Sequence, residues 1–173
     1  MIPISSVVFS RFTWSNLSRN QGCELKSDHQ VTGTLRRPGC RSADYLVATT
    51  QGNWTFRRSG FWGSGTEIVD SASHQLIATF KSDWGGRGEL RHSDGQRYHF
   101  ECKGLWHPVW TVTAEDGRSV FELHTRERYV EVSNAAGESD RCLTLLVMFA
   151  LYRVQQAEED AASAAVVAVI AVS

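Results

Sequence analysis

The most constraining feature of this sequence is an apolar run near its carboxyl end. Residues 142–152 read CLTLLVMFALY and contain no charged residue; Thr144 and Tyr152 carry the only hydroxyl groups. A surface helix of a globular protein shows a polar face along one side, and this run shows none. The segment must therefore be covered on all sides, either by lipid or by protein.

The length of the apolar segments tests the membrane alternative. Crossing the hydrocarbon core takes about 20 apolar residues. The first run has eleven residues, and a second run at 161–172, mainly Ala and Val, has twelve. Charged residues at 153 and 158–160 separate the two runs, and a charge at the bilayer centre costs roughly 2.5–3.5 kcal/mol. We therefore predict no transmembrane span, and a buried helix of a soluble protein is favoured.

Most of the chain before this run alternates apolar and polar positions, which is typical of short β-strands. Turn residues interrupt the alternation, most clearly at Asp94-Gly95 and Asp116-Gly117, because glycine accepts a positive φ without steric cost. These two turns lie 22 residues apart, which suggests a meander that repeats one hairpin unit. About twelve antiparallel strands follow from the spacing of the turns. They are expected near residues 7–14, 23–26, 31–36, 45–50, 53–58, 66–69, 75–80, 88–92, 97–102, 109–113, 119–124 and 128–133.

The strand count and the apolar run lead to one architecture. Ser139 or Asp140 can cap a helix that continues through the run. A helix is about 10–12 Å across, too wide for an eight-stranded barrel, whereas an eleven-stranded barrel already holds one. We predict a mainly β fold, a closed antiparallel barrel of about 12 strands around a central hydrophobic α-helix.

The domain organisation follows from this architecture. Residues 1–156 are expected to form one barrel domain that includes the central helix at 140–156. Residues 157–173 then form an Ala/Val-rich tail. A second helical segment from Asp160 is one interpretation of this tail, and its Val and Ile residues leave the end of that segment open.

The hairpin segments resemble a known group of proteins. GNWTFRRSGFWGSGTEIVDSASHQLIATFK and GQRYHFECKGLWHPVWTVTAEDGRSVFELHTR are similar to the strand–turn–strand hairpins of the superfamily that contains the tubby C-terminal domain, the phospholipid scramblases and the LURP-one-related proteins. CLTLLVMFALYRVQQ resembles the central helix of that fold. The resemblance implies a small tubby-like barrel whose partner is a membrane phospholipid or a protein.

The same resemblance points to Arg57 and Arg58 as ligand-binding residues. Tubby domains that bind phosphoinositides use basic residues on the barrel surface, and paired guanidinium groups suit phosphate. Alternation along a strand sends Arg57 and Arg58 to opposite faces, so only one of them can join a given patch. A solvated strand face is the plainer interpretation of this pair.

Charge and cysteine content exclude other classes. The chain carries 18 basic and 19 acidic residues, and nucleic-acid binding requires a clear basic excess. The four cysteines, at 23, 40, 102 and 142, form no CxxC pair. They are expected to be thiols in a reducing compartment, which together with an amino-terminal segment unlike a signal peptide favours the cytoplasm, with membrane association compatible.

No catalytic, metal or cofactor site is predicted. His99 and Cys102 lie three apart, so a strand places them on opposite faces. The other histidines nearby, at 92, 107 and 124, follow no zinc-ligand spacing. Ser64 lacks the glycines that a nucleophile turn carries two positions to either side of the serine. The aromatic residues Trp54, Phe56, Phe61, Trp62, Trp106 and Trp110 are expected to pack on the central helix or to close the barrel ends.

These observations favour a non-enzymatic binding or scaffold module. The alternative is a carrier that holds a hydrophobic small molecule in the barrel cavity, with the apolar run outside. Occupancy of the lumen distinguishes the two, because a helix inside the barrel leaves no carrier cavity. A hydrolase is disfavoured, since no nucleophile–base spacing stands out.

Overall fold

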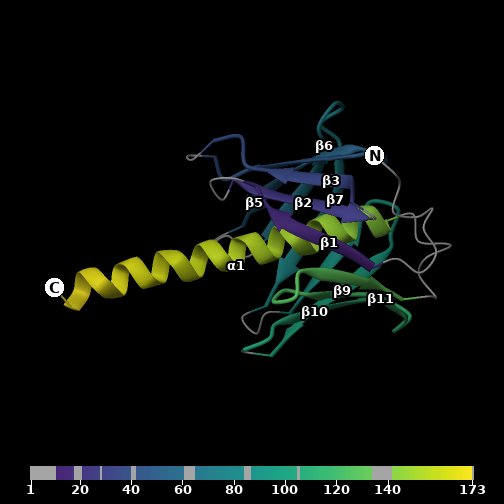
Figure 1. The fold of residues 1–173 in the computed structure, drawn as a ribbon. Helices are drawn as coiled ribbons and strands as arrows, with labels where there is room; N and C mark the ends of the chain where they lie inside the picture. Colours follow the sequence, from purple (N-terminus) through teal and green to yellow (C-terminus); the bar gives the residue numbers. More distant parts are fainter. Residues whose placement is uncertain are drawn as a thin grey trace.

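Twelve β-strands and one long α-helix make up the computed structural model of this chain (Figure 1). It describes residues 11–17, 21–27, 29–39, 42–60, 65–83, 87–104, 106–133 and 142–172, with side chains to residue 162. The elements are β1 (Arg11–Asn16), β2 (Gly22–Ser27), β3 (Gln30–Arg36), β4 (Tyr45–Thr49), β5 (Asn53–Ser59), β6 (Gly65–Asp70), β7 (Leu76–Ser82), β8 (Arg87–His92), β9 (Arg97–Lys103), β10 (Val109–Ala114), β11 (Ser119–His124), β12 (Tyr129–Val132) and α1 (Leu143–Val172).

The strands form a closed up-and-down barrel. Every strand pairs antiparallel with its neighbours in sequence, and β1 closes the sheet by pairing with β12, where Arg11 lies opposite Glu131. A closed sheet has no edge strand whose backbone groups lack partners. The predicted fold class is confirmed.

The turns explain why the strand boundaries could be predicted closely. Gly95 and Gly117 have φ angles of 96° and 81°, as the two Asp-Gly hairpins require. Eleven predicted strands agree with the structure to within two residues at each end. The first differs more: β1 runs from Arg11 to Asn16, and residues 7–10 lie outside the described residues. The expected turn at 134–137 and the helix cap at Ser139 or Asp140 lie outside them too.

The first half of α1 passes through the barrel (Figure 1). Except for Arg153, which is half-buried, residues 142–156 of this helix are buried all round. The wall comes closest at β3, where a Cβ on Gly33 would lie 2.7 Å from Met148 Sδ. The apolar run is thus covered by protein.

Aromatic rings join the helix to the wall. Phe149 of α1 lies 4.9–5.6 Å, centroid to centroid, from the rings of Phe56, Phe80 and Phe100. Tyr152, one turn further along, makes an edge contact with Tyr45 at 5.3 Å. Rings at these separations and angles gain electrostatic complementarity in addition to apolar burial. They hold the helix between β4, β5, β7 and β9.

The helix does not stop where the barrel ends. It was expected to end at residue 156 with a separate segment from Asp160, but α1 is one helix from Leu143 to Val172. Its sequence contains no Gly or Pro, and the residues around 156, QQAEED, are compatible with helix. The division expected at 156/157 instead marks a change in burial: Gln156 is buried, whereas Ala157 and Glu158 are exposed. Within the described part of the chain, no helix has the length and apolarity needed to cross a membrane.

Candidate functional site at the helix-exit end of the barrel

The end of the barrel from which α1 emerges, called the exit end here, is defined by the strand directions. Gln155 Nε2 donates to Asn16 Oδ1 at 3.5 Å, which places the last residue of β1 beside the emerging helix. Because adjacent strands are antiparallel, all odd-numbered strands end at the exit end. The described ends of β3, β5, β7, β9 and β11 therefore lie at the end of the barrel from which the helix emerges.

Arg57 and Arg58 lie at the end of β5, on opposite faces of the wall as predicted. Arg57 points outward, and its Nε lies 3.3 Å from Asp44 Oδ2. Arg58 lies on the face that carries the buried Trp54 and Phe56, and its Nη2 is 3.4 Å from Asp160 Oδ1 of α1. The two arginines therefore do not form one site.

A second arginine at the exit end, Arg37, also pairs with a carboxylate of α1, and the sequence did not single it out. Arg37 follows β3, and its Nη2 lies 2.6 Å from Glu159 Oε2. Tyr45 at the start of β4 donates its hydroxyl to the other oxygen of the same carboxylate. Burial, with this hydrogen bond, raises the pKa of the Tyr45 hydroxyl well above its usual value. We call Arg37, Tyr45, Arg58, Glu159 and Asp160 the exit collar.

A surface pocket of about 440 Å³ opens within the exit collar. It is lined by Arg37, Ala43, Arg58, Glu159, Asp160 and Ala162. Both guanidinium groups already face a carboxylate of α1, so an external anion must compete with Glu159 and Asp160. The Arg58–Asp160 pair is mostly exposed, and such a pair contributes little stability. The side of the pocket near Arg58 is accordingly the easier one for a phosphate to enter.

A third arginine lies just below the collar. The guanidinium of Arg153 sits 5.1 Å from the centroid of Phe80 and 5.9 Å from that of Trp110, over both rings. Its Nη1 donates to Gln156 Oε1 at 3.0 Å. Burial lowers the pKa of Arg153 from its ordinary value. Aromatic faces and an amide oxygen thus offset the cost of placing this charge inside the wall.

The six singled-out aromatic residues divide into core and surface. Trp54, Phe56 and Trp110 are buried, as predicted, and Phe61 and Trp62 lie outside the described residues. The prediction for Trp106 was wrong, because its side chain is 88% exposed. It occupies the β9–β10 connection, where Gly104 at φ 89° turns the chain sharply. A large apolar ring is therefore held in solvent at the exit end.

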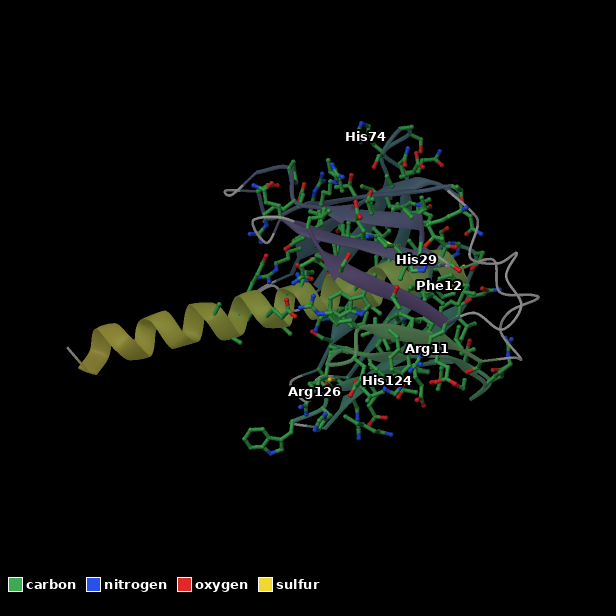
Figure 2. The ribbon with its side chains drawn as sticks, in the orientation of Figure 1. Arg11, Phe12, His29, His74, His124 and Arg126 are labelled. Carbon is green, nitrogen blue, oxygen red and sulfur yellow. The ribbon has the colours of Figure 1, made fainter. Side chains whose placement is uncertain are left out.

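The loop that carries Trp106 is fixed by its neighbours. Thr125 donates both its backbone N–H, at 3.2 Å, and its hydroxyl, at 2.8 Å, to Pro108 O. Arg126 Nη1 lies 2.8 Å from the ring of His107. Arg126 itself lies toward the exit end (Figure 2). The β9–β10 and β11–β12 connections thus support each other beneath the exposed indole.

Among the described residues, His99, Cys102, His107 and His124 do not meet at one site, whereas His92 lies close to Cys142. His99 is exposed on the outer face, whereas Cys102 packs against the core, on opposite faces as predicted. His124 stacks on Tyr129 at 4.2 Å, and His107 contacts Arg126. The described cysteines, Cys23, Cys102 and Cys142, are not in disulfides.

Comparison with known proteins identifies no relative. No family model, no curated protein and no solved structure matches the chain.

Proposed function

We propose that this chain is a non-enzymatic binding module whose exit end docks on a phospholipid membrane surface. The observation that carries the proposal is the exposed indole of Trp106, held at the same end of the barrel from which α1 projects. Tryptophan is enriched at membrane interfaces because its ring is apolar and its N–H is polar. A tubby-like or scramblase-like role would agree with this proposal. It is supported by the resemblance of the hairpin and helix sequences to those of that superfamily.

Occupancy of the lumen favours a binding surface over a carrier. Leu146, Phe149 and Leu151 point in different directions around α1, and all three are fully buried. The helix fills the space that a carrier would use for its ligand. A ligand of this barrel therefore has to bind its outside or its ends.

The projecting part of α1 has a length suited to one leaflet. Residues 157–172 extend about 24 Å at 1.5 Å per residue, and the apolar part, 161–172, about 18 Å. The hydrocarbon core is about 30 Å thick. The acidic residues Glu158, Glu159 and Asp160 precede the apolar part, and Glu159 is paired with Arg37 of the exit collar. In a docked molecule these charges lie at the level of the lipid headgroups.

The exit collar supplies the phosphate-binding groups in this proposal. Guanidinium groups form bidentate hydrogen bonds with phosphate oxygens. Arg58 exchanges its weak, exposed contact with Asp160 for a lipid phosphate. Arg37 keeps Glu159, so the helix stays anchored during docking.

Vesicle flotation tests the proposal. The full chain is mixed with vesicles of phosphatidylcholine, alone or with phosphatidylinositol bisphosphate, next to Trp106→Ala, Arg58→Gln and a chain that ends at residue 162. Leu76→Ala is the matched control, because Leu76 is another exposed apolar residue, at the start of β7 and so at the opposite end.

We expect the full chain and Leu76→Ala to float with the vesicles, and Trp106→Ala and the shortened chain to float severalfold less. Arg58→Gln is expected to lose the preference for the charged lipid while keeping part of the binding to phosphatidylcholine. Absence of flotation by the full chain, or equal flotation by all variants, would contradict membrane docking and direct attention to a protein partner.

A further inference from the structure

At the end of the barrel opposite the exit end, three side chains of metal-ligand type meet. His92, Asp94 and Cys142 each offer one ligand atom, and these atoms all lie within 4.8 Å of one another. The His92 Nδ1–Asp94 Oδ1 distance is 2.8 Å. Cys142 is buried, whereas the side chains of His92 and Asp94 are partly open to solvent. The cluster is thus closed on the protein side and reachable from outside.

The fold brings these residues together from two separate elements. His92 ends β8, and Asp94 lies in the tight turn that leads into β9. Cys142 immediately precedes α1 and its carbonyl accepts the first helical hydrogen bond, from Leu146 N at 2.9 Å. A negative charge on the sulfur would lie at the positive end of the helix dipole.

The turn positions the carboxylate. Gln96 N donates to Asp94 Oδ1 at 3.0 Å. The Gln96 side chain also touches the cluster: its Oε1 lies 3.7 Å from Cys142 Sγ and accepts the Tyr98 hydroxyl at 2.6 Å. The surrounding residues thus position the sulfur and the carboxylate.

We propose that His92, Asp94 and Cys142 form a binding site for zinc or a similar divalent transition-metal cation. Imidazole nitrogen, carboxylate oxygen and thiolate sulfur are the three donor types that zinc takes in proteins. Ligand atoms bound to one tetrahedral ion at about 2.0–2.3 Å lie roughly 3.3–3.8 Å apart. Binding therefore requires the pairs of atoms that are now up to 4.8 Å apart to close to that range. The His92 Nδ1–Asp94 Oδ1 contact of 2.8 Å has to open slightly. The thiol releases one proton to solvent as the ion binds, and water fills the fourth position.

The site links the helix to the barrel wall at the end opposite the exit collar. His92 and Asp94 belong to the β8–β9 hairpin, and Cys142 leads directly into the buried helix. An ion bound only in the folded state stabilises that state, and the stabilisation grows with the logarithm of the free ion concentration once that concentration exceeds the dissociation constant. We therefore infer a metal clamp between the barrel and its central helix.

Cobalt binding tests the site, because a thiolate ligand gives Co²⁺ a charge-transfer absorption in the near ultraviolet. The full chain, stripped of metal, is titrated with Co²⁺ and then with competing Zn²⁺. The variants are Cys142→Ser and Asp94→Asn, and the matched controls are Cys102→Ser and His99→Gln, a cysteine and a histidine that lie outside the cluster.

We expect one Co²⁺ per chain with the thiolate band, displaced by Zn²⁺, and a higher Tm with either ion. Cys142→Ser should lose the band, and Asp94→Asn should weaken binding at least tenfold, whereas both controls keep the band and the affinity. If Cys142→Ser does not fold, Asp94→Asn decides, because that side chain is half exposed and Asn keeps an acceptor for Gln96 N. No band in the full chain, a band that survives in Cys142→Ser, or unchanged affinity in Asp94→Asn would overturn the proposal.

Discussion

Gly33 is the residue at which the barrel wall leaves room for the helix. A Cβ there would lie 2.7 Å from the sulfur of Met148, which is fully buried. We expect Gly33→Val to lower the free energy of unfolding by about 1–3 kcal/mol, as overpacking of a core does. Urea denaturation measures the loss.

Two further variants show whether the cause is contact with the helix. Gly39→Val is the control, because a Cβ on Gly39 meets nothing within 4 Å. Combining Gly33→Val with Met148→Ala removes the crowding, so the two effects should be less than additive. Full additivity would mean that Gly33 and Met148 do not interact.

The buried thiol of Cys23 makes the free energy of unfolding depend on pH in the alkaline range. Burial, together with Glu158 and Glu24, raises the pKa of its thiol from 9.0 to about 12. Above pH 9 the unfolded chain therefore loses this proton while the folded chain keeps it, so the stability contribution present below pH 9 is lost as pH rises toward 12. We expect the free energy of unfolding to fall between pH 9 and pH 11, and to fall less steeply in Cys23→Ala. Equal slopes in the two proteins would contradict this assignment.

Single residues differ in how far the sequence could place them. Gly95 and Gly117 were predictable because the turn itself demands a positive φ. The opposite faces of Arg57 and Arg58 followed from strand alternation alone. The exposure of Trp106 could not be predicted from the sequence. Aromatic residues of β-proteins are buried on average, but Trp106 lies in a loop that begins at Gly104, and this loop holds its ring in solvent.

At the scale of elements, the exit collar holds α1 against the wall through one carboxylate in particular. Glu159 accepts from both Arg37 and Tyr45, whereas the neighbouring Asp160 contacts the exposed Arg58. Glu159→Ala leaves the buried Tyr45 and the half-buried Arg37 without their common acceptor and should cost about 1–3 kcal/mol. Asp160→Ala should cost less than about 0.5 kcal/mol. Thermal melts of both variants check the difference, and equal losses would show that the collar does not anchor the helix.

The elements were largely predictable, but the sites that they form were not. Period-two alternation and spaced turns fixed the strands, and an apolar run without a polar face indicated a buried helix. Arg37, however, follows β3 whereas Arg58 belongs to β5, and Cys142 lies 46 residues from Gln96. Only the register of the closed sheet, and the depth to which the helix enters it, bring such residues together.

At the scale of the whole molecule, the central claim is that α1 is the core of the barrel. The sequence could predict this architecture because about twelve strands form a barrel wide enough to hold a helix. A barrel of fewer strands has no room for one. The continuation of α1 to Val172 was less predictable, because an apolar Ala/Val segment after a charged stretch is compatible with several conformations. Burial ends near Gln156, so the enclosed part and the projecting part of one helix play different roles.

The most direct test is the free energy of unfolding across an alanine scan of the enclosed helix, including Leu146, Met148, Phe149 and Leu151. Each of these side chains is fully buried although they point to different sides of the helix. The structure predicts a loss of roughly 2–5 kcal/mol at every one of them, because core cavities relax only partly. Large losses only at every third or fourth position, with tolerant residues between, would place the helix on the outside of the barrel and contradict the account.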